Sequence, residues 1–160
     1  MKSCWLYFFV LIFISNLCIS QSQLEFGPKG GLNLTFIKVP EASFGDNIEV
    51  KVGYYAGLFV DVPIEGSLSI QPEVLYVGIN DFKFINAPIY LKVKASDRFN
   101  ILIGPSMNYF FDFFSNKFKV RADLSISHQI LKALNVHLKF ALGFEEVTPN
   151  GLFLGMDLRI

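Results

Sequence analysis

Apolar and polar residues alternate along most of the chain after residue 23. In residues 52–62, every even position is apolar, whereas the odd positions include Gly53, Gly57 and Asp61. A period of two is typical of a β-strand whose two faces meet different surroundings. No segment shows a convincing helical period; at most, residues 128–134 would form one helical turn. We predict eight strands, at residues 24–36, 51–62, 68–77, 85–94, 99–112, 118–127, 136–145 and 152–160.

The number and length of these strands favour a membrane barrel. Their length of about ten residues is what a tilted strand needs to cross a bilayer, whereas strands of soluble proteins are typically about five or six residues long. The connections are short, and the longest is a predicted loop at 37–50. The pattern therefore predicts an all-β fold, an eight-stranded antiparallel up-and-down transmembrane β-barrel.

Alternation alone fits both a soluble barrel, with its apolar rows inside, and a membrane barrel, with its apolar rows facing lipid. The apolar rows at 52–62, 99–111 and 136–144 carry no charge, and many glycines fall on the polar rows, where a narrow lumen needs small residues. If the N-terminus lies in the periplasm, outward aromatic residues gather at one rim, as in an aromatic girdle. The predicted girdle consists of Phe36, Tyr54, Tyr76, Tyr109, Phe111, Phe118 and Phe144.

In a membrane barrel the polar rows face the lumen, and their positive and negative charges nearly balance. Buried charges must be paired, so we predict ion pairs rather than a selectivity filter of one sign. Eight strands enclose an interior just wide enough for side chains to fill, which predicts a plugged barrel rather than a porin. The predicted lumen network consists of Lys29, Lys51, Asp61, Glu73, Lys92, Lys119, Arg121, Asp123, Lys139, Glu145, Asp157 and Arg159.

The first twenty residues have a different design. Lys2 precedes an uncharged apolar run at residues 4–14, and small and polar residues follow. This layout is typical of a secretory signal peptide with a cut after Ser20. The alternative is a membrane anchor, but the run is short for a spanning helix of about 20 residues. We predict a cleaved signal peptide at 1–20 and a barrel domain at 21–160, which leaves Cys4, Cys18 and Trp5 in the leader.

The net charge and the cysteine content exclude several classes of ligand and cofactor. Lys+Arg and Asp+Glu each number 14, and a zero net charge argues against nucleic acid. Without its leader the chain has no cysteine, and therefore no disulfide, thiol nucleophile or cysteine-based metal site. The histidines, His128 and His137, lack the spacing of a metal motif. We therefore predict neither a metal nor a cofactor.

The residue types of a catalytic triad occur in Ser106, His137 and Asp123, but no Gly-x-Ser-x-Gly sequence surrounds a serine. The neighbouring carboxylates Glu145 and Glu146 are explained by a solvated rim. We predict that the chain is not an enzyme. Two alternatives stay open: a membrane-barrel hydrolase or acyltransferase, and a soluble exported lipocalin-like barrel that binds an apolar ligand.

Several segments resemble the PorT-like outer-membrane β-barrel family in their order and spacing. These are residues 26–34, 56–64, 68–76 and 87–92, and the pair Gly104-Pro105. The resemblance implies an outer-membrane barrel, and the family's name implies a link to protein secretion that belongs to a few members. The C-terminal segment 153–160 is similar to a barrel-assembly signal, although it ends in Ile160 where an aromatic residue is usual.

We therefore expect a small barrel with a structural or binding role in the outer membrane of a Gram-negative bacterium. The expected partners are outer-membrane lipid, the barrel-assembly machinery and secretion-complex proteins, with an accessory role in a PorT-type secretion pathway as the finer expectation. In loop 37–50, Glu41, Asp46 and Glu49 outnumber Lys38, and such an acidic lip would suit a cation or a basic partner surface.

Overall fold

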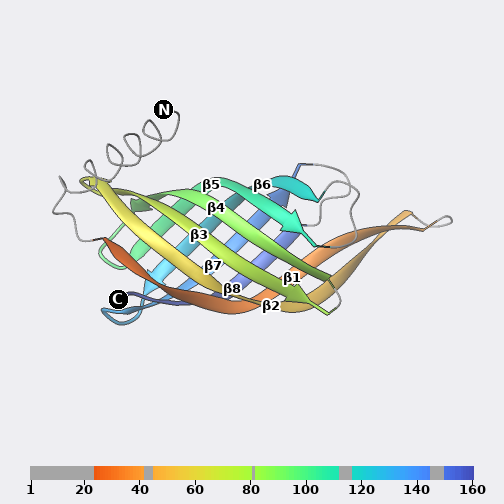
Figure 1. Ribbon diagram of the computed structural model, residues 1–160, viewed down its shortest axis with the longest axis horizontal. Coiled ribbons are helices and arrows are strands. Elements are labelled where there is room, and N and C mark those ends of the chain that lie inside the picture. The colour runs from red at the N-terminus through yellow and green to blue at the C-terminus, as the bar shows by residue number, and fades with distance from the viewer. Residues whose placement is uncertain (1–23, 42–44, 81, 112–116, 145–149) are drawn as a thin grey trace, which may run out of the picture.

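The computed structural model describes residues 24–160 except 42–44, 81, 112–116 and 145–149, so the predicted signal peptide lies outside the described residues. Within the described part, no helix is long and apolar enough to cross a bilayer. Each strand pairs antiparallel with its sequence neighbours, and β1 pairs with β8 to close the barrel (Figure 1). The strands are β1 (Glu25–Glu41), β2 (Gly45–Glu65), β3 (Leu68–Ile79), β4 (Phe82–Lys94), β5 (Phe99–Phe110), β6 (Phe118–Gln129), β7 (Leu134–Gly143) and β8 (Asn150–Leu158).

The burial of side chains alternates along the strands and shows which row faces out. In β2, Leu58 is 64% exposed, whereas its neighbour Phe59 is 2% exposed. The same alternation leaves rows of Leu, Ile and Val on the outer surface and places Lys, Asp, Asn and Ser inside. The predicted eight-stranded up-and-down barrel, with its apolar rows outward, is confirmed. A lipocalin-like barrel would bury the apolar rows instead.

The predicted loop at 37–50 is wrong. β1 and β2 stay paired almost to their tip, with Lys38 opposite Ile48 and Glu41 opposite Gly45. On the outer edges, pairing with β8 ends at Phe36 and pairing with β3 begins at Tyr54. Residues 37–41 and 45–53 therefore form a two-stranded β1–β2 ribbon beyond the barrel wall (Figure 1). The β-branched residues of this segment favour strand, and a proline is tolerated at a strand edge.

Other element ends differ from the prediction by a few residues. The connection between the predicted strands 68–77 and 85–94 is shorter, because Gly78 and Ile79 belong to β3 and β4 begins at Phe82. Asn80 has a φ of 50° in this tight connection, a conformation that Asn adopts more readily than most residues. No helical turn forms at 128–134; β6 continues to Gln129, and bends lead into β7.

The barrel has two different ends. Glu25 and the C-terminal Ile160 lie at one end, here called the terminal rim, together with the turn at Gly66 (Figure 1). The other end, the distal rim, carries the β3–β4 connection and the β1–β2 ribbon. Strands run between the rims, so alternate strand ends contribute residues to the same mouth of the lumen.

Closure between β1 and β8 depends on glycine. Gly31 of β1 lies opposite Gly155 of β8. A Cβ atom added at Gly155 would lie 2.2 Å from the Gly30 carbonyl oxygen and 2.2 Å from the Tyr55 hydroxyl, too close for any side chain. The missing side chain lets the backbones approach and leaves room in the lumen for the Tyr55 ring.

Candidate functional site

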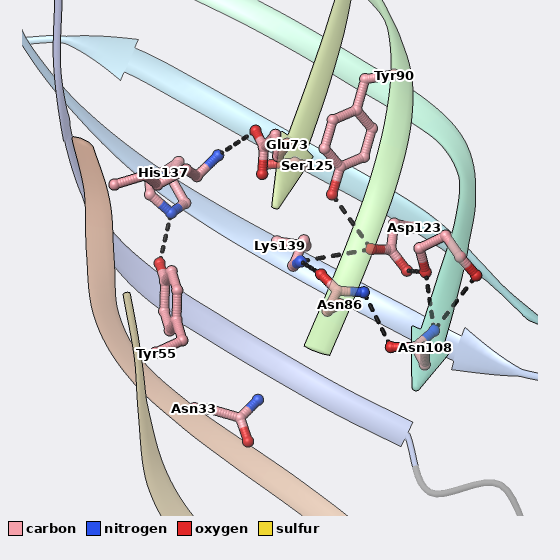
Figure 2. Close-up of polar contacts among 12 residues, drawn as sticks. Asn33, Tyr55, Glu73, Asn86, Tyr90, Asn108, Asp123, Ser125, His137 and Lys139 are labelled. Atoms are coloured by element: carbon pink, nitrogen blue, oxygen red, sulfur yellow. Dashed lines mark hydrogen bonds and ion pairs between the residues drawn. The ribbon is translucent and has the colours of Figure 1, made fainter. Parts of the chain in front are cut away.

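The polar interior of the barrel is organised around several acidic residues, of which Asp123 is the most enclosed. Its carboxylate accepts hydrogen bonds from Ser106 Oγ at 2.8 Å and from the Tyr90 hydroxyl at 3.2 Å. Lys139 Nζ lies 3.4 Å from the same carboxylate and donates to Asn86 Oδ1 at 2.6 Å. Figure 2 shows the contacts of Lys139 with both Asn86 and Asp123. Donors from three other strands thus surround the buried Asp123 carboxylate and satisfy its oxygens.

A second acidic centre is Glu73 of β3. Lys29 Nζ lies 2.7 Å from Glu73 Oε1, which also accepts a hydrogen bond from Gln71 Nε2 at 2.8 Å. Lys29 is on β1, and β1 and β3 are not neighbours in the sheet. This ion pair therefore passes over β2 inside the lumen and depends on the closed barrel.

A third group joins four residues in a line of hydrogen bonds. The Tyr55 hydroxyl lies 2.5 Å from His137 Nε2, and His137 Nδ1 lies 3.2 Å from Asp157 Oδ2 (Figure 2 shows the first contact). Asn135 donates to the other oxygen of Asp157 at 2.6 Å. β2 is thereby connected to β8 and β7 across β1, which lies between β2 and β8 in the closed sheet.

Toward the distal rim, apolar side chains gather in the interior beside buried polar residues such as Thr35, Asn108 and Lys119. A cluster of buried apolar side chains forms a distal plug, which we define as Tyr55, Leu75, Val77, Ile79, Phe84, Phe110, Ala141 and Phe153. The guanidinium of Arg121 lies 5.2 Å from the centre of the Phe84 ring and 5.5 Å from that of Phe110. Within the described part of the chain its Nε and Nη2 have no hydrogen-bond partner, and the two ring faces contribute to the stabilisation of this buried cation.

At the terminal rim the ion pairs become progressively more exposed. Lys92 and Asp61 form a buried pair by direct hydrogen bond. Arg159 Nη1 lies 3.2 Å from Glu25 Oε2 in a partly exposed pair, and Lys94 contacts Asp97 in solvent. Surface pairs of this kind stabilise little compared with buried ones.

The predicted lumen residues lie mostly where the parity places them. Lys51 and Arg159 are half-buried, and Glu145 lies outside the described residues. Of the predicted network, Lys29–Glu73, Lys92–Asp61 and Lys139–Asp123 meet as pairs, whereas Asp157 meets His137. The buried members are Lys29, Asp61, Glu73, Lys92, Lys119, Arg121, Asp123, Lys139 and Asp157.

Part of the predicted aromatic girdle forms a chain of contacts on the outer wall. The Tyr109 ring centre lies 4.9 Å from that of Phe118 and 5.6 Å from that of Phe111, which in turn is 6.5 Å from Tyr76. Tyr54 lies over Gly78 of the adjacent strand, where an added Cβ would meet its ring at 2.8 Å. Phe144 is exposed, Phe36 is half-buried, and neither has a ring contact among the described residues.

Sequence reasoning missed the distal plug and the hydrogen-bonding role of Tyr55 and Tyr90. A signal was present, because Phe59, Phe110 and Phe153 occupy polar-row positions and interrupt the alternation. In a narrow lumen such interruptions mark places where the interior is filled by apolar volume.

The polar residues do not assemble a recognisable catalytic centre in the described part of the chain. His137 bonds to Tyr55 and Asp157, while Ser106 bonds to Asp123, so the triad types found in the sequence do not meet. No group of three or more His, Cys, Asp or Glu side chains is arranged to hold a metal ion among the described residues.

Little space is left between these side chains. A cavity of about 10 Å³ lies between Phe59, Leu102 and Asn135, close to the volume that one water molecule needs. A larger hollow of about 250 Å³ opens only at the terminal rim. The described side chains thus fill the middle of the barrel.

Comparisons with known proteins agree with this architecture. The family model described as "Outer membrane protein beta-barrel domain" matches residues 19–80. The crystal structure of Ail, the attachment invasion locus protein of Yersinia pestis, in complex with the heparin analogue sucrose octasulfate, matches with a TM-score of 0.58. It is 10% identical and covers 86% of this chain and 99% of its own. The chain has the fold of a transmembrane β-barrel.

A second structure, from work on the de novo design of transmembrane β-barrels, has a TM-score of 0.54 at 11% identity. It covers 84% of this chain and 96% of its own. No curated protein matches the sequence. The family match and the shared fold support an outer-membrane β-barrel, while nothing in them points to the PorT-like members in particular.

Proposed function

We propose that the chain is a small outer-membrane barrel whose lumen is closed by its own side chains, and that it has a structural or binding role rather than acting as a pore. The observation that carries this proposal is the reversal of its two faces. Apolar rows cover the outside, where Leu58 and Ile89 are exposed, while paired charges such as Lys29 and Glu73 are buried inside. Only a lipid environment stabilises such an outer surface.

The test of location is fractionation of cells that produce the full chain. We expect it in the outer-membrane fraction, with faster gel migration before boiling than after, because a closed barrel resists unfolding by detergent at room temperature. Recovery of the intact protein in a soluble fraction would refute the proposal.

The closed lumen has its own test. Purified protein inserted into a planar lipid bilayer should give no discrete conductance steps, since the distal plug and the Asp123 centre leave no continuous path. A porin of known conductance, inserted under the same conditions, serves as the control. Regular steps from this chain would contradict the plugged lumen.

Orientation and pathway are finer proposals. We place the terminal rim in the periplasm, and an accessory role in a PorT-type secretion pathway rests on the sequence resemblance alone. Crosslinking in intact cells, followed by mass spectrometry of the captured proteins, tests the pathway. Labelling of a single cysteine at Ser67 from outside the cell tests the orientation, because this turn belongs to the terminal rim; we expect no labelling.

A further inference from the structure

The hollow at the terminal rim, which we call the vestibule, is larger than the small cavity deeper in the lumen. It measures about 250 Å³ and is lined by residues from β1 to β6 and by Arg159. The Lys92–Asp61 pair lies at its wall, and Lys92 also borders the small cavity deeper in the lumen. The vestibule is therefore a recess with an inner end, large enough for a molecule smaller than a typical drug.

The charges around the vestibule cancel one another. Lys92 with Asp61, Arg159 with Glu25, and Lys94 with Asp97 all line it as ion pairs. A bound anion would be attracted by the Lys and Arg side chains and repelled by the carboxylates paired with them. A bound cation would be attracted by the carboxylates and repelled by the Lys and Arg side chains. The recess thus gives no net attraction to an ion of either sign.

Several buried polar groups in the vestibule are not committed to partners. Asp61 is 5% exposed, and its Oδ1 has no hydrogen-bond partner among the described residues. Ser69 and Asn100 are also buried, and within the described part of the chain their side chains make no hydrogen bond. Ser69 lies opposite Lys92 in the sheet, and Asn100 lies opposite Lys94. The polar atoms of Ser69 and Asn100 are therefore available to a ligand that enters the vestibule.

We propose that the vestibule binds a neutral polyhydroxylated ligand, namely one saccharide unit. Sugar hydroxyls both donate and accept hydrogen bonds, so they can exchange hydrogen bonds with the side chains of Ser69 and Asn100, which line the vestibule. A neutral ligand also leaves the surrounding ion pairs intact. The inference rests on the proposed plugged barrel, because the recess has an inner end only if the lumen is closed.

The test uses the folded protein in a detergent without a sugar headgroup, such as an amine oxide, followed by amide NMR. We expect methyl glucoside to shift the signals of Ser69 and Asn100 saturably, while inorganic phosphate and an alkylammonium ion cause no saturable shift. A soluble glucan oligosaccharide is titrated in parallel. Binding of both sugars assigns the site to any terminal unit, and binding of the oligosaccharide alone assigns it to a polymeric glycan.

Variants connect the binding to this recess. The double substitution Ser69→Ala with Asn100→Leu should weaken methyl glucoside by about tenfold or more, because two hydrogen-bonding groups are lost. Ser127→Ala, a buried lumen serine that lines only the deeper cavity, is the matched control and should leave affinity unchanged. No saturable sugar shift, tighter binding of phosphate or ammonium, or equal affinity in the double variant would overturn the inference. The same samples are run unboiled on a gel, so a folded barrel that does not bind refutes this inference and leaves the proposed function standing.

Discussion

The ammonium group of Lys139 is enclosed by groups that compensate its charge. Asp123 lies 3.4 Å away, Asn86 accepts its hydrogen bond, and the Phe153 ring centre lies 4.1 Å from Nζ. Removing one member of such a buried pair leaves the other charge without compensation in a medium of low dielectric constant. The loss of free energy of unfolding on removal of one charge should therefore increase with the burial of its ion pair in the lumen.

Lys139→Met keeps most of the side-chain volume and removes the charge. We expect the free energy of unfolding to fall by about 3–5 kcal/mol, because Asp123 stays buried without its cation. Arg159→Met at the terminal rim is the control and should cost about 0–1 kcal/mol, since its pair with Glu25 is partly exposed. Urea unfolding in lipid vesicles measures both, and equal losses would contradict the assigned depths.

For single residues, the alternation of the sequence was enough to predict that Lys139 and Asp123 face the lumen. It did not predict that the two side chains form a pair. A partner inside a lumen is decided by strand register and by which strands face each other across the barrel, and neither is encoded locally. Glu73 illustrates this limit: its cation comes from β1, two strands away in the sheet.

Among the strand pairs, the seam between β1 and β8 leaves no room for side chains at two facing positions. Gly31 and Gly155 face each other there, and an added Cβ at Gly31 would lie 2.1 Å from the Leu154 carbonyl oxygen. The alternation of the sequence identified both strands, and it also placed glycines on the polar rows. It did not reveal that glycine serves backbone approach at this seam, because that depends on contact between the first and last strands.

Gly155→Ala tests the seam. We expect a large loss of the unboiled fast-migrating band after refolding, since β1 and β8 must separate to admit the methyl group. Gly66→Asn is the control, because Gly66 has a φ of 58° and open space around it, and Asn tolerates this conformation. If Gly155→Ala refolds as well as the parent chain, the close approach at the seam is refuted.

The β1–β2 ribbon is expected to be dispensable for the barrel. Lys38 and Ile48 lie opposite each other, so residues 39–47 can be replaced by an Asn-Gly turn without changing the register. The shortened chain should keep the heat-modifiable band and change the free energy of unfolding by less than about 1 kcal/mol. Failure to refold would show that the ribbon contributes to barrel assembly.

Considered as a whole, the molecule presents lipid with a surface that would be the core of a soluble protein. This reversal was predictable from the sequence, because along each strand a row without charges alternates with a row that carries nearly all the charges. The proportion of apolar filling inside was not predictable from the rows, since Phe110 and Phe153 become a plug only when the distal ends of several strands converge.

The reversal is tested with tryptophan as a depth probe in the mature chain, which contains no Trp because Trp5, the only one in the sequence, lies in the predicted leader. Leu58→Trp should be quenched several-fold by brominated lipid, whereas the adjacent Phe59→Trp should be nearly unaffected, because Leu58 is 64% exposed and Phe59 is 2% exposed. Fluorescence in vesicles with and without bromine gives the comparison. Equal quenching at both positions would refute the assigned faces.

The hydrogen bonds that cross the lumen have a consequence for how the molecule is made. Lys29 on β1 pairs with Glu73 on β3 across β2, and Tyr55 on β2 bonds to His137 on β7 across β1 and β8. A single hairpin that entered the bilayer alone would expose unpaired charged side chains to hydrocarbon, because their partners lie on strands that have not yet been inserted. Stepwise insertion is thereby penalised, and concerted closure becomes the favoured route. The ion pairs that stabilise the closed barrel thus also disfavour partly inserted intermediates.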